Sequence, residues 1–176
     1  MDYETQKVVI IDDEQTTLLL LEHAIAPIAQ VLTCSDSSQA LDVISQSLPD
    51  LVLLDINMPG VSGFELCETL KASTHTAHIP VIFITSHNDI DNERNALTLG
   101  AIDFISKPID VELCRLRVNN HLVMAKQKRM LDNLNQAIEK EKQQLAVTLR
   151  SIADGVISTD ANGLITFINP VAQRLT

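Results

Sequence analysis

The sequence contains no hydrophobic run long enough to cross a membrane. A membrane-spanning helix needs about 20 consecutive apolar residues, and no stretch of the 176 residues approaches that length. The first nine residues, MDYETQKVV, carry an acidic residue at position 2 and lack the apolar core of a secretory signal. We therefore expect a cytoplasmic protein that does not bind a membrane.

Cysteine is scarce as well. The chain has only Cys34, Cys67 and Cys114, an odd number without the spacing of a metal site. Thiols of a cytoplasmic protein are normally reduced. We expect neither a disulfide framework nor a cysteine-bound metal.

Positive charge is rare in the first part of the chain. Residues 1–114 hold 4 of the 13 Lys and Arg residues but 18 of the 23 Asp and Glu residues. Because phosphate contacts need cations, this part is not expected to bind nucleic acid. Residues 115–150 hold 8 Lys and Arg residues against 3 acidic ones, which indicates a change of structural role near residue 115.

Short apolar runs alternate with stretches that are long enough for helices. The predicted strands are 7–11, 31–34, 51–55, 81–85 and, more weakly, 102–106. The predicted helices are 15–25, 37–47, 62–73, 89–99 and a stretch from 110 onward. This alternation predicts an α/β fold in which helices cover both faces of a five-stranded parallel sheet.

Polar side chains end four of these strands. Asp12 and Asp13 follow the first, Asp55 ends the third, Thr85 ends the fourth and Lys107 ends the fifth. Sites in open parallel sheets gather at the carboxyl ends of the strands. We therefore expect three carboxylates, a hydroxyl and an ammonium to share one edge of the sheet.

This set of groups is suited to phosphoryl transfer. Carboxylates that repel one another favour a divalent cation, and Mg²⁺ prefers oxygen ligands. Asp12 and Asp13 would hold Mg²⁺ beside Asp55, which would act as a nucleophile and form an aspartyl phosphate. Lys107 and Thr85 would contact the phosphoryl oxygens.

Four motifs, IIDDE, LLDINMPGVSGFEL, VIFITS and GAIDFISKPI, resemble those of the response-regulator receiver domain, in the right order and spacing over about residues 5–121. The resemblance implies a doubly wound, flavodoxin-like sheet. It also implies that Asp55 accepts a phosphoryl group from a histidine kinase or phosphotransfer protein.

The resemblance assigns further roles. It makes Asp12, Asp13 and Asp55 metal ligands together with the backbone carbonyl of Asn57, and Lys107 the invariant lysine. Thr85 matches the switch hydroxyl, Phe104 the aromatic switch residue, and Pro108 the proline that usually follows a cis peptide bond. The family often has Tyr in place of Phe104, so a hydrogen bond from that ring is absent here. His87 borders the site and is a candidate modulator of dephosphorylation.

Each residue alone has an ordinary explanation. Asp55 could end a turn, Asp12 and Asp13 could cap the first helix, and Lys107 could be a solvated lysine. Only the set supports a site. Two other functions stay open: a phosphatase or hydrolase that uses Asp55 as nucleophile, and a receiver-like interaction module that works without phosphorylation.

Residues 113–152 contain neither Gly nor Pro and are rich in helix formers. The last receiver helix is therefore expected to continue for about 40 residues, which requires a partner. In one register the a and d positions are Leu131, Leu134, Ile138, Glu141, Leu145, Thr148 and Ile152. Leu116, Val123 and Met130 follow another register, which predicts a stutter near residue 130. The pattern predicts a parallel homodimer through residues 116–152; the alternatives are a single solvated connector helix and a helix folded back on its own domain.

The last 26 residues change character again. Two strand-like runs, GVIST and LITFIN, flank Asn162-Gly163, which predicts a hairpin, and Pro170 would begin a helix. This stretch resembles the opening of a PAS domain. The expected organisation is a receiver domain (1–121), a coiled-coil signalling helix (122–152) and the start of a PAS-like domain (153–176). The fragment itself is not expected to be an enzyme; a cyclic-dinucleotide enzyme or a kinase would be encoded beyond residue 176.

Overall fold

The computed structural model describes residues 5–86, 98–151 and 154–175. The chain divides into two compact units, Met1–Lys126 and Gln127–Thr176. Most of the predicted helix at 89–99 lies outside the described residues, and so does His87.

A five-stranded parallel sheet forms the centre of the first unit. Its strands are β1 (Lys7–Ile11), β2 (Gln30–Cys34), β3 (Leu51–Asp55), β4 (Val81–Ser86) and β5 (Asp103–Lys107). They lie in the order β2-β1-β3-β4-β5, and every neighbouring pair is parallel. This is the doubly wound, flavodoxin-like order, so the predicted fold class is confirmed.

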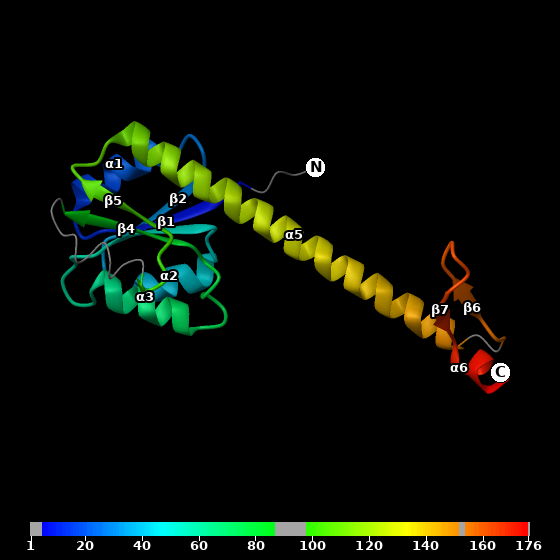
Figure 1. The fold of residues 1–176 in the computed structure, drawn as a ribbon. Helices are drawn as coiled ribbons and strands as arrows, with labels where there is room; N and C mark the ends of the chain where they lie inside the picture. The colour runs from blue at the N-terminus through cyan, green and yellow to red at the C-terminus, as the bar shows by residue number, and fades with distance from the viewer. Residues whose placement is uncertain (1–4, 87–97, 152–153, 176) are drawn as a thin grey trace. The chain divides into compact units, whose positions relative to one another are not determined.

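Helices cover both faces of this sheet. They are α1 (Gln15–Ile25), α2 (Ala40–Ser47), α3 (Gly63–Ala72) and α5 (Val111–Ser151). Figure 1 shows α2 and α3 on one side of the sheet and α1 and the first turns of α5 on the other. Each face has its own apolar core, one with α2 and α3 and one with α1 and α5. Strands buried on both faces explain why their sequences are continuous apolar runs.

One helix boundary differs from the prediction. Helix α2 begins at Ala40, three residues later than expected. Residues 37–39 form a turn instead, in which the Asp36 carboxylate accepts the Ser38 backbone N–H at 2.9 Å. Short polar side chains that bond the backbone two residues ahead favour such turns over helix.

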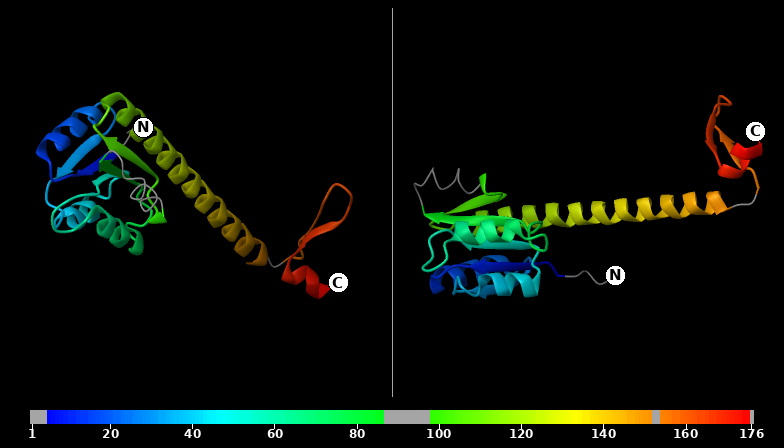
Figure 2. Two further views of the ribbon diagram at one scale, coloured as in Figure 1. Left: turned by 60° about the vertical axis from the view of Figure 1, so that its left-hand side comes forward. Right: turned by 90° about the horizontal axis from the view of Figure 1, so that it is seen from below.

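Helix α5 is 41 residues long and unbroken, as predicted; Figure 2 shows its course from two further directions. Within the first unit its buried residues are Cys114, Val118 and Leu122. From Lys126 to Thr148 every side chain is exposed, including Leu134 and Ile138. In the described part of the chain, no helix is both long and apolar enough to cross a membrane.

The second unit ends in a hairpin and a short helix. Strands β6 (Ile157–Thr159) and β7 (Ile165–Ile168) pair antiparallel, and α6 (Pro170–Leu175) follows. The predicted hairpin is therefore confirmed. The buried Asn169 side chain holds these parts together: its Oδ1 accepts the N–H groups of Val156 and Ala172, each at 2.9 Å.

Candidate functional site

The carboxyl ends of β1, β3 and β5 bring four of the predicted site residues together. Asp12 follows β1, while Asp55 and Lys107 are the last residues of β3 and β5. One carboxylate oxygen each from Asp12, Asp13 and Asp55 lies within 4.8 Å of the others. Asp12 and Asp55 are buried, and Asp13 is exposed. The parallel register of the sheet therefore creates an acidic cluster that opens to solvent on the Asp13 side.

Lys107 lies inside this cluster. Its Nζ is 3.0 Å from Asp12 Oδ2, 3.2 Å from Asp55 Oδ1 and 3.3 Å from Glu14 Oε2. Glu14 was not among the predicted site residues, although it follows Asp12-Asp13 directly in the sequence. The peptide bond between Lys107 and Pro108 is cis, in agreement with the resemblance.

Burial and mutual repulsion shift the ionisation of the cluster. Burial, followed by the charge of Asp12, raises the pKa of Asp55 to about 6, against the opposing effect of Lys107. Burial also raises the pKa of Asp12. Burial by itself would lower the pKa of Lys107, but its hydrogen bond to Asp12 and the charge of Asp55 outweigh this and raise it. Asp55 is thus ionised at neutral pH, at a cost that a cation would relieve.

Oxygen atoms suitable for a hard cation are present. Asp12 Oδ2 is buried and lies 3.0 Å from the Lys107 ammonium, its ion-pair partner. Its other oxygen, Oδ1, accepts the Glu14 N–H at 2.9 Å. The N-cap residue of helix α1 is Glu14 rather than Asp12 or Asp13. A buried carboxylate oxygen beside two further carboxylates fits Mg²⁺, which prefers oxygen ligands.

The loop after β3 holds Asp55 and Asn57. The Asn57 N–H donates to Asp55 Oδ2 at 3.1 Å. Gly63, the first residue of α3, packs so tightly that an added Cβ would overlap the Asp55 carbonyl oxygen. Ser62 and Glu65 form a capping box that begins α3 at this point. In the sequence, only the glycine itself indicates this close packing at position 63.

The two predicted switch residues lie on neighbouring strands. Thr85 follows Ile84, the β4 residue that pairs with Asp55, and its buried hydroxyl donates weakly to the Ser86 carbonyl at 3.3 Å. Phe104 on β5 pairs with Phe83 and packs against the core on the α2 and α3 side.

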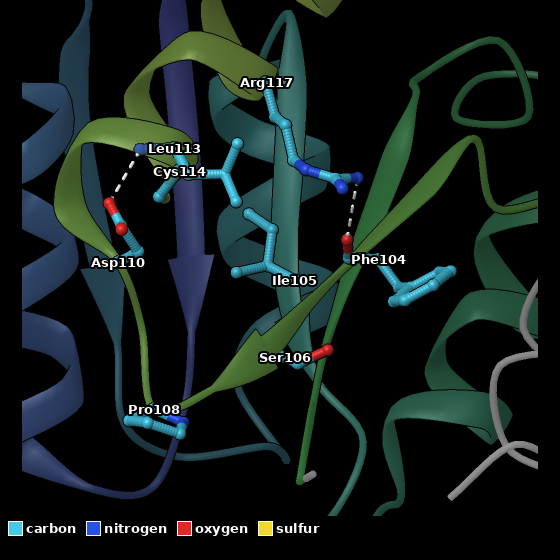
Figure 3. Close-up of a pocket in the computed structure, with 8 residues that line it drawn as sticks. All are labelled: Phe104, Ile105, Ser106, Pro108, Asp110, Leu113, Cys114 and Arg117. Atoms are coloured by element: carbon cyan, nitrogen blue, oxygen red, sulfur yellow. Dashed lines mark hydrogen bonds between the residues drawn. The ribbon is translucent and has the colours of Figure 1, made fainter. Parts of the chain in front are cut away.

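A hollow of about 400 Å³ lies between β5 and the first turns of α5. Figure 3 shows the Phe104 ring turned away from it, while Arg117 reaches toward the Phe104 carbonyl oxygen. Arg117 Nη1 also donates to Asp103 Oδ1 at 2.7 Å, and His121 Nε2 lies 3.1 Å from Asp103 Oδ2. No sequence pattern indicated this cluster of Asp103, Arg117 and His121, because Arg117 and His121 are 14 and 18 residues from Asp103.

Several proteins are similar to this chain in sequence. A probable cyclic di-GMP phosphodiesterase of Vibrio cholerae is 33% identical over 150 residues, which cover 85% of this chain and 34% of that protein. Response regulator PleD of Caulobacter vibrioides is 36% identical over 131 residues, 74% of this chain and 28% of that protein. The chain thus spans about a third of the length of these relatives.

Solved structures agree. NtrX from Brucella abortus superposes with a TM-score of 0.68 at 28% identity, over 74% of this chain and 30% of that one. A receiver domain protein from Clostridium thermocellum has a TM-score of 0.63 at 30% identity, over 72% of this chain and 98% of that one. Residues 8–119 match the model of the response regulator receiver domain. Together with the acidic cluster and the strand order, this match shows that the chain belongs to the response regulator receiver domain family.

Proposed function

We propose that Asp55 accepts a phosphoryl group from a histidine kinase or phosphotransfer protein and so serves as the input of a signalling relay. The observation that supports this most is the position of Asp55. Its carboxylate is buried at a strand end, lies within 4.8 Å of two further carboxylates and is 3.2 Å from the Lys107 ammonium. Such a set of groups neutralises charge on a transferred phosphoryl group.

The proposed step is a displacement at phosphorus. An ionised Asp55 oxygen forms the new O–P bond while the P–N bond of a phosphorylated histidine breaks, and that electron pair goes to the imidazole nitrogen. The Lys107 ammonium, already 3.2 Å from Asp55 Oδ1, stabilises the negative charge that arrives there. The Thr85 hydroxyl turns from the Ser86 carbonyl to donate to a phosphoryl oxygen.

The cation belongs to the same proposal. Asp12, Asp13, Asp55 and the Asn57 backbone carbonyl would hold it. Bound Mg²⁺ would balance the charge of the phosphoryl oxygens and lower the pKa of Asp55. The buried Oδ2 of Asp12, close to the carboxylates of Asp13 and Asp55, supports this assignment.

The signal would leave through helix α5. Thr85 and Phe104 would couple the state of Asp55 to α5, which would dimerise in parallel through residues 116–152. The exposed apolar residues of this stretch, Leu131, Leu134, Ile138 and Leu145, support a helical partner. The hairpin and α6 would begin a PAS-like domain, followed by an output domain. The Vibrio cholerae relative is named as a probable cyclic di-GMP phosphodiesterase, so the proposed output domain could be an enzyme.

Acetyl phosphate tests the proposed acceptor. Incubation with Mg²⁺ should add one phosphoryl group, seen by intact mass as a base-labile adduct, and removal of Mg²⁺ with EDTA should abolish it. Asp55→Asn should take up none, whereas Asp42→Asn, at an exposed position on α2, should behave as the wild type. An equal adduct in Asp55→Asn would refute the assignment. Many turnovers on a small phosphate ester would instead indicate a hydrolase.

A further inference from the structure

The loop that carries Asn57 is fastened by a residue from another part of the chain. Ser37 lies in the turn between β2 and α2, and its side chain is buried, although serine is usually exposed. Its hydroxyl donates to the Pro59 carbonyl oxygen at 2.8 Å and accepts the Val61 N–H at 3.2 Å. One hydroxyl thus bridges two backbone groups of the loop between β3 and α3.

The approach of Ser37 to this loop is close. Gly60, between the two bonded residues, has φ +86, and an added Cβ there would lie 3.3 Å from Ser37 Oγ. Only glycine adopts this left-handed conformation without strain. Gly60 and Pro59 are exposed, so without Ser37 their backbone groups would bond water and the turn would be free to move.

The turn that presents Ser37 is itself fixed. The Asp36 carboxylate accepts the N–H of Ser38 at 2.9 Å and the Gln39 side-chain amide at 2.8 Å. A hydrogen bond from the Ser38 hydroxyl to the same carboxylate, together with these two bonds, holds the pKa of Asp36 below its usual value. The bond from the Ser38 hydroxyl has the largest effect. Ser37 is therefore presented from a preorganised turn.

We infer that Ser37 is a positioning residue for the proposed phosphorylation site: its hydroxyl fixes the loop that carries Asn57, whose backbone carbonyl is a proposed ligand of the cation. This inference rests on the proposed function, because it concerns the same cation site. Pro59 is two residues beyond Asn57, and the Asn57 N–H bonds Asp55 Oδ2. The buried Met58 side chain is the other anchor of this segment. Loss of Ser37 should therefore loosen the loop without altering the charge of the acidic cluster.

Ser37→Ala removes the bridge, and Ser45→Ala is the matched control, since Ser45 is an exposed serine on the following helix α2. Hydrogen exchange of the metal-free full chain should show the peptide over residues 57–63 exchanging about tenfold faster in Ser37→Ala only. Calorimetric titration should show about tenfold weaker Mg²⁺ binding in Ser37→Ala, the size expected when a residue that orients a metal ligand is lost. Phosphorylation by acetyl phosphate should need correspondingly more Mg²⁺.

The outcomes separate this inference from the proposed function. If the wild type takes up no phosphoryl group, the proposed function fails. If the wild type is phosphorylated and Ser37→Ala binds Mg²⁺ as Ser45→Ala does, Ser37 is only structural and this inference is overturned, whatever the exchange data show. If Ser37→Ala does not fold, Ser37→Cys replaces it, because a thiol has the same shape as the hydroxyl, although it is larger, and bonds only weakly; wild-type Mg²⁺ affinity in that variant would overturn the inference.

Discussion

The fold surrounds the Asp55 carboxylate with groups that destabilise its charged form. This carboxylate is buried beside Asp12, and its pKa is raised to about 6. The Lys107 ammonium relieves only part of this cost. A group whose charged form is disfavoured by the fold gains from any ligand that neutralises it. A cation bound at the proposed site would therefore recover part of the free energy that burial of Asp55 costs.

Replacing Asp55 should stabilise the metal-free protein. Because the folded state binds the proton of Asp55 more tightly than the unfolded state does, the free energy of unfolding falls as pH rises from about 4 to 6. In EDTA at pH 7.5, Asp55→Asn should raise the free energy of unfolding by on the order of 2 kcal/mol. At pH 4.5 most of this gain should vanish. Urea unfolding at both pH values measures the effect.

Mg²⁺ and an exposed aspartate provide the controls for this prediction. Mg²⁺ should stabilise the wild type and leave Asp55→Asn nearly unchanged, while Asp42→Asn should follow the wild type throughout. A gain in Asp55→Asn that is the same at both pH values would show that removal of the charge is not its cause.

At the scale of elements, polar contacts attach α5 both to helix α1 and to strand β5. Arg115 Nε donates to the Ala24 carbonyl at the end of α1 at 2.7 Å. On β5, Asp103 accepts from Arg117 and contacts His121, one helical turn apart on α5. Burial would raise the pKa of Asp103, but the Phe104 N–H and these two side chains outweigh it and lower the pKa. Helix α5 is thus bound to the strand that carries the predicted switch residue Phe104.

Asp103→Ala should therefore weaken the attachment of α5. It leaves the half-buried Arg117 and His121 without their shared partner, which should lower the free energy of unfolding by about 1–3 kcal/mol at neutral pH. Because the folded pKa of Asp103 is lowered, its contribution is present above about pH 4 and is lost as pH falls further. Thermal unfolding at pH 7 and below pH 4 tests this. Asp132→Ala, at an exposed position on the same helix, should have little effect; an equal loss there would contradict the role of Asp103.

At the scale of the whole molecule, the part of α5 that belongs to the second unit has exposed apolar side chains. Leu131, Leu134 and Leu145 are 56–58% exposed, and Ile138 is 41% exposed. They recur at heptad spacing, which is the pattern of a coiled coil. An exposed helix of this length with an apolar stripe is stabilised by packing against a partner.

We expect the chain to be a dimer in solution. Light scattering at tens of micromolar should give twice the mass of one chain, and Leu134→Lys should make it monomeric. Asn133→Lys, one position off the stripe, should leave the dimer intact. A monomeric wild type would refute the prediction, and equal disruption by both variants would show that charge rather than the stripe is responsible.

The hairpin and α6 should be less protected than the sheet. Their described apolar residues Ile157, Leu164 and Ile165 are exposed, whereas Val52 and Ile82 are fully buried. Amide exchange should therefore be fast in β6 and β7 and slow in β3 and β4. Protection of the hairpin equal to that of the sheet would show a complete structural element and argue against the start of a larger domain.

The sequence by itself determined the strands, the sheet edge and the residues gathered there. Asp12, Asp55 and Lys107 each end an apolar run, and parallel strands bring such ends together. The length of α5 could also be predicted from the sequence, because helix propensity is a local property and this stretch has many helix formers and neither Gly nor Pro. The late start of α2 was missed because the Asp36 side chain competes with the helix for the backbone.

Only the tertiary structure decided which distant residues touch. Ser37 bonds Pro59 across 22 residues, Lys107 pairs with Glu14 across 93, and Asp103 joins Arg117 and His121 on α5. No local pattern encodes these contacts, because a serine or an arginine has the same propensities with or without such a partner. They exist because the folded sheet fixes the positions of backbone and charged groups, and buried polar groups must then find partners.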